Sequence, residues 1–507
     1  MRSLVGYVMA SEGIYKPDRI EVTLTKNATV HRGEYLMVEL DGKNVMLQAE
    51  DVYVKRQTSS YDEKLVRDGM IREDEERVVA KAVCYQVGYL EDGEIKPYLY
   101  PIPPLTRVYR PSEQELDSFI APDGTSISIG TIYPTPVPLR LDLKMLFRQG
   151  ALIIGGVGTG KSTLMLTLMV KILHTAKNPH LLLIDWDGEY NTQVLVEAAE
   201  RAGGYLKLSA PLRLVTRPKH LSPYEAYQQI RNLSGRAAND RVMRALFAVA
   251  GQLAMSGVQT VEWSRAGLRQ LTQKIERPDL RWEADKIIDE IFDKIFRSTS
   301  ESQEGEVNIV EAVRNNALVH IDMSKAQSWD EIVNVARQAV EECYKEARSD
   351  QNFGVAVFID EVHNFVPQFP SEGAASKFAY EEIIPVMKLV ATTGPRNGVP
   401  LFIATQRFSE VDKFITTQMG QNLFAFRVED VDLTRLREIV GSDIAYSTRM
   451  LPRGHCIYKG QAIRIQRPVL TVVEKVGDVA SVGKDLLTRW ALISEGDEAL
   501  HRRRETS

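Results

Sequence analysis

An eight-residue glycine-rich segment constrains the fold of this chain more than any other feature of its sequence. Residues 155–162 read Gly-Gly-Val-Gly-Thr-Gly-Lys-Ser and match the pattern G-x-x-x-x-G-K-S/T, whose backbone N–H groups bind the phosphates of a nucleotide. The apolar run 151–154 before it predicts a buried strand, and residues 163–173 after it predict a helix. Because strand, loop and helix follow one another in the required order, we expect a P-loop nucleotide site in an α/β fold.

The residue types in this segment suit the chemistry of bound ATP. Lys161 can reach the β- and γ-phosphates as a positive charge and is a predicted catalytic residue, while the Ser162 hydroxyl can ligate Mg²⁺. The N-terminus of the following helix adds positive charge beside the phosphates. ATP and Mg²⁺ are therefore the expected cofactors, and the predicted ATP-binding residues are Gly156, Val157, Gly158, Thr159, Gly160, Lys161, Ser162 and Thr163.

A second apolar strand, at residues 355–359, ends in two carboxylates, and this far after a P-loop it has the Walker B form. We predict that Asp360 holds Mg²⁺ through water, together with Ser162. We predict that Glu361 is catalytic and orients and polarises the attacking water. His363 follows closely, and we interpret it as a packing or helix-start residue.

Two further apolar strands end in polar side chains. Residues 401–405 precede Gln406, whose amide both donates and accepts hydrogen bonds, so we predict that Gln406 is a third catalytic residue and senses the γ-phosphate. Residues 181–185 lead into a segment, 185–190, that reads Asp-Trp-Asp-Gly-Glu-Tyr. This segment either faces the ligand crevice at the carboxyl edge of the sheet or forms a helix-capping turn.

The pattern of predicted secondary structure changes near residue 150. Before it, short β-branched or apolar runs at 5–9, 19–24, 34–39, 44–48 and 78–90 predict a small β-barrel, with a hairpin signal at Asp41-Gly42. After it, apolar strands alternate with helical patterns, which predicts a mainly parallel sheet, and strands return at 456–459, 463–467 and 469–474. A polar helical pattern interrupts the alternation and indicates an inserted bundle.

We therefore expect an α/β protein with a RecA-like, additional-strand P-loop core. The expected parts are an N-terminal small β-barrel at 1–120, the ATPase core at 121–216 and 313–475, an inserted helical bundle at 217–312 and a C-terminal tail at 476–507.

Composition limits where a nucleic acid could bind. The 507 residues include 63 Lys and Arg against 68 Asp and Glu, a formal net charge of −5, so positive charge for DNA must be concentrated in a groove or pore. Cys84, Cys343 and Cys456 lie far apart, which argues against a zinc site or a disulfide framework and favours a reducing, cytoplasmic compartment. No run of about 18 apolar residues is present, so we expect no membrane span.

These motifs resemble those of the HerA family of archaeal DNA translocases, within the HerA/FtsK class of ATPases, along almost the whole chain. The resemblance implies a homohexamer that threads double-stranded DNA through a central pore as a translocase or helicase. It also implies a NurA-like partner nuclease docked on the barrel, with a role in DNA end resection and double-strand break repair by homologous recombination. The resemblance rests on Gly6-Tyr7-Val8, Gly33-Glu34-Tyr35, the Asp-x-x-Gly-Glu-Tyr element at 185–190, the Ile-Asp-Glu-x-His element at 359–363 and the Ala-Thr-Gln-Arg element at 404–407.

Arginines and lysines outside the motifs are candidates for contacts between molecules. Additional-strand ATPases couple hydrolysis to motion when a neighbouring subunit contributes an arginine, which predicts a ring. Arg148 and Arg396 are candidate arginine fingers, although each stands one place away from the family's usual position, and the alternative is an ordinary surface arginine. Lys377, Arg407 and Lys413 are candidate contacts to DNA phosphates, the alternative being solvated charge.

Two rival functions stay open at this stage. One is a DNA-pumping ATPase for conjugation or viral packaging, which the lack of a membrane span and the N-terminal barrel disfavour. The other is a non-catalytic, ATP-gated DNA clamp, which the intact Lys161, Asp360 and Glu361 disfavour. An ATP hydrolysis assay with and without DNA separates the motors from the clamp.

Overall fold

The computed structural model describes residues 2–10, 15–56, 78–214, 220–234, 240–262, 265–296, 306–369 and 377–479. The chain divides into two compact units, one formed by Met1–Pro211 with Val310–Ser507 and the other by Leu212–Ile309. The second unit begins and ends a few residues before the expected 217–312, because a short ladder between residues 213–214 and 306–307 belongs to it. Most of the expected tail, from residue 480 on, lies outside the described residues.

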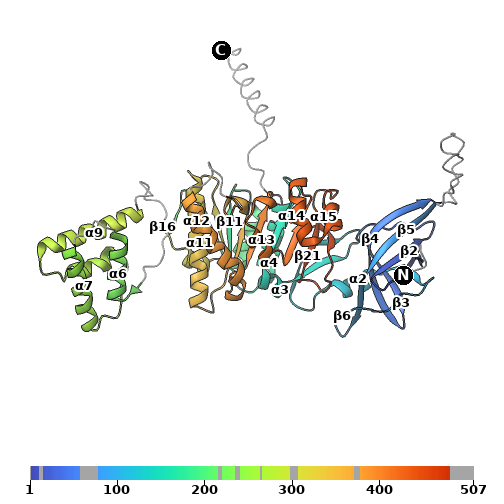
Figure 1. Ribbon diagram of the computed structural model, residues 1–507, viewed down its shortest axis with the longest axis horizontal. Helices are drawn as coiled ribbons and strands as arrows, with labels where there is room; N and C mark the ends of the chain where they lie inside the picture. Colours follow the sequence, from blue (N-terminus) through green and yellow to red (C-terminus); the bar gives the residue numbers. More distant parts are fainter. Residues whose placement is uncertain are drawn as a thin grey trace, which may run out of the picture. The chain divides into compact units, whose positions relative to one another are not determined.

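The N-terminal part of the first unit is a closed β-barrel, drawn in blue in Figure 1. The strand order is β2-β1-β7-β3-β4-β5-β6, and pairing of β2 with β5 closes a ring of six strands. Asp41 and Gly42 take φ values of 50° and 73°, as a two-residue hairpin turn requires, and join β3 to β4. The barrel is therefore confirmed, and its strands are β1 (Ser3–Val8), β2 (Arg19–Leu24), β3 (Tyr35–Leu40), β4 (Lys43–Arg56), β5 (Val78–Glu91), β6 (Glu94–Lys96) and β7 (Arg107–Arg110).

The rest of the first unit is built on an eleven-stranded sheet in the order β12-β17-β11-β18-β19-β10-β20-β21-β22-β8-β9. The strands from β12 to β20 are parallel, and those from β20 to β9 are antiparallel. The strands are β8 (Ser126–Ile132), β9 (Pro138–Asp142), β10 (Ala151–Ile154), β11 (Leu181–Asp185), β12 (Tyr205–Ser209), β17 (Leu318–Asp322), β18 (Ala356–Ile359), β19 (Leu401–Thr405), β20 (Asn422–Ala425), β21 (His455–Gly460) and β22 (Val469–Val473).

The position of β19 decides the class of the core. It lies between β10, which leads into the P-loop, and β18, which leads into the acidic pair. One strand is therefore inserted between the two nucleotide-binding strands, and the predicted additional-strand P-loop fold is confirmed.

One predicted strand, at 463–467, is wrong. Ile463 and Ile465 are buried, which produces the alternating pattern of a strand, but the segment makes no ladder. The backbone here makes single hydrogen bonds to the ends of other elements. The N–H of Asp142, the last residue of β9, donates to the Ala462 carbonyl, and the Arg464 N–H donates to the carbonyl of Ile120, the last residue of a helix. The strand prediction was therefore wrong because it rested on the alternation of apolar and polar residues alone.

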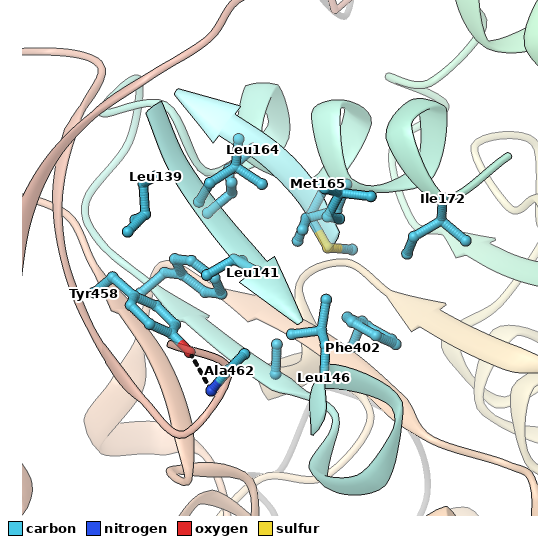
Figure 2. Close-up of a cluster of buried hydrophobic side chains, with 14 of the residues drawn as sticks. Leu139, Leu141, Leu146, Leu164, Met165, Ile172, Phe402, Tyr458 and Ala462 are labelled. Atoms are coloured by element: carbon cyan, nitrogen blue, oxygen red, sulfur yellow. Dashed lines mark hydrogen bonds between the residues drawn. The ribbon is translucent and has the colours of Figure 1, made fainter. Parts of the chain in front are cut away.

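Helix α4 (Lys161–Thr175) packs its apolar residues against the sheet. Leu164, Met165 and Ile172 join Phe402 of β19 in one buried cluster, shown in Figure 2. Phe402 stacks on Phe358 of β18 with ring centroids 4.4 Å apart. The other helices of this unit are α2 (Glu113–Ile120), α3 (Leu143–Gln149), α5 (Gln193–Ala202), α10 (Ile309–Asn315), α11 (Trp329–Ser349), α12 (Lys377–Thr393), α13 (Lys413–Met419), α14 (Asp430–Val440) and α15 (Ser442–Thr448).

The second unit is helical, as predicted, and has an apolar core of its own that includes Ile230, Leu246, Leu268 and Ile288. Its helices are α6 (Pro223–Ser234), α7 (Asp240–Met255), α8 (Arg265–Thr272) and α9 (Pro278–Phe296). Two short ladders accompany them, β13 (Arg213–Leu214) with β16 (Glu306–Val307) and β14 (His220–Leu221) with β15 (Val261–Glu262). Among the described helices of the whole chain, none is long and apolar enough to cross a membrane.

Candidate nucleotide-hydrolysis site

The P-loop joins the end of β10 to the start of α4. Gly158 and Gly160 take φ values of 69° and 123°, which L side chains rarely adopt. A Cβ atom at Gly160 would also lie 2.9 Å from the ring of Phe426, so this position has no room for a side chain. The Thr159 hydroxyl donates a 2.9 Å hydrogen bond to the Gly156 carbonyl, which closes the loop on itself.

Lys161 is the first residue of α4, and its side chain is buried at 6% exposure. Its Nζ donates a 3.0 Å hydrogen bond to the Gly156 carbonyl, so the ammonium group lies within the loop. The helix N-terminus and this ammonium group together place positive charge where phosphates of a nucleotide would lie.

Asp360 follows β18 and is almost fully buried. Its Oδ2 accepts a 2.7 Å hydrogen bond from the Tyr190 hydroxyl, and its Oδ1 accepts one of 2.8 Å from the Glu361 N–H. Burial, reinforced by the neighbouring Glu361 charge, raises the pKa of Asp360 to about 7, while the charge of Lys161 opposes this shift. The Gly155 N–H of the P-loop donates a 3.3 Å hydrogen bond to the Thr405 carbonyl at the end of β19, the strand next to β18, so the P-loop and the acidic pair lie at the same edge of the sheet.

Glu361 has a left-handed backbone with φ of 48°. Its Oε2 lies 3.2 Å from Nδ1 of His363 and accepts a 3.4 Å hydrogen bond from the Gln406 N–H. The structure therefore brings Gln406 to the acidic pair, through its backbone. The interpretation of His363 as a packing residue missed its contact with Glu361, because a three-residue turn after β18 (η3, Val362–Asn364) folds the ring back.

The segment after β11 forms a tight turn at the site and does not cap a helix, because the next helix, α5, begins at Gln193 with Thr192 as its N-cap. Asp185 accepts hydrogen bonds from the backbone N–H groups of Gly188, Glu189 and Tyr190, at 2.9, 3.2 and 3.1 Å, and so holds a tight turn. A buried His320 ring fixes Asp185 from the other side, with Nε2 at 2.9 Å.

That turn presents two side chains to the site. The Tyr190 hydroxyl reaches Asp360, and Glu189 lies near Ser162 of the P-loop. Burial raises the pKa of Glu189, and the nearby Ser162 hydroxyl opposes the rise. Glu189 and Tyr190 were not among the predicted site residues. The element at 185–190 was the signal that pointed to them, but its sequence did not distinguish a cap from a site.

The group of ligands suits Mg²⁺ held mainly by water and phosphate. Among the described residues, no cluster of three or more His, Cys, Asp or Glu side chains could hold a metal by itself. Mg²⁺ keeps several waters and commonly takes only one or two carboxylates together with substrate phosphates, which the Ser162 hydroxyl and the Asp360 carboxylate can complement.

We compared the sequence of the chain with models of known protein families. Residues 127–359 match the model of the central domain of helicase HerA, from the first strand of the core sheet to the residue before Asp360. Over these residues the chain is similar to the HerA central domain. No curated protein sequence matches the chain.

The chain is also similar to solved structures. The bacterial conjugative coupling protein TrwB, in a form lacking its N-terminus, has a TM-score of 0.42 at 13% identity, over 74% of this chain and 94% of that one. The pCW3 conjugation coupling protein TcpA has a TM-score of 0.33 at 11% identity, over 90% and 89%. The genome packaging NTPase B204 of Sulfolobus turreted icosahedral virus 2, in complex with ATP-gammaS, has a TM-score of 0.32 at 10% identity, over 64% and 98%.

The two candidate arginine fingers lie away from the P-loop of their own chain. Arg148 is near the end of α3, just before the amino end of β10, and Arg396 is in the short helix η4 (Pro395–Asn397), just before the amino end of β19. Both side chains are exposed, and α3 contacts η4. Since the P-loop and acidic pair lie at the carboxyl ends of these strands, the arginines mark the opposite edge of the sheet.

The candidate DNA contacts are spread over three elements. Lys377 begins α12, and its side chain lies outside the described residues. Arg407 pairs with Glu410 at 3.3 Å and Lys413 pairs with Glu438 at 2.8 Å, all exposed. Arg407 also lines a cavity of about 600 Å³ beside the acidic pair, together with Trp186, Trp329, Glu361 and Gln406.

Proposed function

We propose that this chain is an ATP-driven motor that moves along double-stranded DNA as a translocase or helicase. The observation that supports this most is the edge of the core sheet where Lys161 of the P-loop, the Asp360–Glu361 pair and Gln406 lie. A domain that only binds nucleotide has no need for a glutamate fixed beside the acidic Mg²⁺ ligand.

The residues divide the work of hydrolysis between them. Lys161 and the start of α4 neutralise phosphate charge, and Ser162 and Asp360 orient the nucleotide through the Mg²⁺ that they help to hold. Mg²⁺, when bound, supplies positive charge to the phosphates. Glu361 then orients the attacking water by accepting its proton in a hydrogen bond, while the backbone of Gln406 ties that carboxylate to β19.

The proposal includes a ring of subunits, which the resemblance to the HerA family implies is a homohexamer. Arg148 and Arg396 lie on contacting elements at the sheet edge remote from their own P-loop, so either could serve the site of a neighbouring subunit. An arginine supplied in this way stabilises the charge of the transition state. Hydrolysis then depends on the ring, which couples it to movement.

The DNA and the partner belong to the same proposal. Lys377, Arg407 and Lys413 would follow phosphates in the pore without reading sequence, and such binding weakens as salt rises. A NurA-like nuclease docked on the barrel would receive the DNA, and the pair would act in end resection during double-strand break repair.

The test is ATP hydrolysis by the purified protein with and without double-stranded DNA. We expect DNA to stimulate turnover, and Glu361→Gln to keep ATP binding while lowering turnover by roughly 100-fold or more, because the group that orients the water is lost. Glu197→Gln, on the exposed face of α5, is the matched control and should behave as the wild type. The proposal would be refuted by the absence of hydrolysis in the wild type, or by normal turnover in Glu361→Gln.

A further inference from the structure

The ring of His363 lies between the end of β18, which Glu361 follows, and the end of β19. It is buried in the turn that follows β18, and its Nδ1 is 3.2 Å from Oε2 of Glu361. The same nitrogen is 3.3 Å from the hydroxyl oxygen of Thr405, the fully buried last residue of β19. One ring nitrogen therefore contacts both the predicted catalytic carboxylate and the last residue of β19.

The chemistry of the contact assigns the donor. An ionised carboxylate only accepts hydrogen bonds, so the contact with Glu361 is favourable when Nδ1 carries its hydrogen. The Thr405 hydroxyl oxygen already accepts a 3.1 Å bond from the Arg407 N–H, which helps to hold it beside the ring. The Gln406 N–H supplies a second donor to the same carboxylate oxygen at 3.4 Å.

Nδ1 of His363 and the Gln406 N–H thus both contact the same oxygen of the Glu361 side chain, Oε2. The backbone of Glu361 is held separately, because its carbonyl accepts a 2.9 Å bond from the Asn364 N–H in the turn. With the backbone and one carboxylate oxygen fixed, the direction of the other oxygen, Oε1, is determined as well.

We propose that His363 is a positioning residue for Glu361: it fixes Oε2, so that Oε1 is aimed to orient the attacking water. The inference rests on the proposed ATP hydrolysis and adds a second residue to it. A residue that only packs would tolerate an apolar side chain of similar size. A positioning residue requires a hydrogen-bond donor at the place of Nδ1.

The experiment measures kcat and KM for ATP, with saturating double-stranded DNA, in the wild type and in His363→Leu, His363→Asn and Glu361→Gln. We expect His363→Leu to lower kcat by about 10- to 100-fold with KM changed by less than about twofold, because a small misplacement of a catalytic group costs this much. His363→Asn, whose amide N–H can reach the same carboxylate, should recover most of the lost turnover.

A double variant tests whether His363 acts through Glu361. Adding His363→Leu to Glu361→Gln should cause little further loss, since two residues that act as a unit are not additive. Full additivity, an unchanged kcat in His363→Leu, or equal rates in the Leu and Asn variants would each overturn the inference. ATP binding and thermal unfolding, measured on every variant, show whether each is folded, and the Asn variant decides the question if the Leu variant is not.

The outcome distinguishes this inference from the proposed function. A wild type that hydrolyses no ATP would overturn the proposed function and the inference with it. A wild type and a Glu361→Gln variant that behave as proposed, next to a fully active His363→Leu, would overturn the inference alone.

Discussion

The hydrogen bond from Tyr190 to Asp360 offers a quantitative test of the site. Tyr190 is fully buried, Asp360 is 5% exposed, and their oxygens are 2.7 Å apart. Replacing Tyr190 with Phe removes the hydroxyl donor, so Oδ2 of Asp360 loses this hydrogen bond. A hydrogen bond to a charged group contributes about 1.5–3 kcal/mol. At about 1.4 kcal/mol per pKa unit, the loss should raise the pKa of Asp360 by about one to two units.

The direction of the effect on activity depends on whether the ionised or the protonated form of Asp360 serves the Mg²⁺-bound nucleotide. Burial and the charge of Glu361 already raise the pKa of Asp360 to about 7, whereas the Tyr190 bond lowers it. Only the ionised carboxylate serves the Mg²⁺-bound nucleotide, so kcat/KM should fall as the pH drops through the pKa of Asp360. A higher pKa moves this acidic limb to higher pH in Tyr190→Phe.

The assay is the pH profile of kcat/KM for ATP, which reports the free enzyme. Tyr344→Phe is the matched control, because its buried hydroxyl lies 2.7 Å from the Thr393 hydroxyl in a pair between α11 and α12. An acidic limb that stays in place in Tyr190→Phe, that moves to lower pH, or that moves equally in Tyr344→Phe would refute the reasoning.

Two further predictions concern the P-loop and the core. Lys161→Ala should weaken both ATP binding and hydrolysis because it removes the charge at the phosphates, and normal turnover in this variant would contradict the assignment. Lys171→Ala is the control on the same helix: it loses its ion pair with Glu474, which follows β22, and should keep both properties. Phe402→Ala should lower the free energy of unfolding by about 3–5 kcal/mol, measured by denaturant titration, because Phe402 is fully buried against Phe358. The half-exposed Phe414→Ala should cost clearly less, and equal losses would count against the packing argument.

The elements of the core could be predicted because their signals are continuous in the sequence. The strands at 151–154, 181–185 and 401–405 have the predicted bounds, and the one at 355–359 begins one residue later. Each is a run of buried apolar residues in which nearly every position contributes to the same core. The failure at 463–467 shows the limit: alternation reports burial, and only a neighbouring strand turns it into a ladder.

The sequence by itself determined the P-loop, the acidic pair after β18, the polar end of β19 and the barrel hairpin, because each depends on residues that are adjacent in the chain. The tertiary structure decided which side chains complete the site. Tyr190 meets Asp360 across 170 positions, His320 meets Asp185 across 135, and Thr405 meets His363 across 42. Such pairs form only when parallel strands align their carboxyl ends at one edge, and no local pattern of residues records which strands will be neighbours.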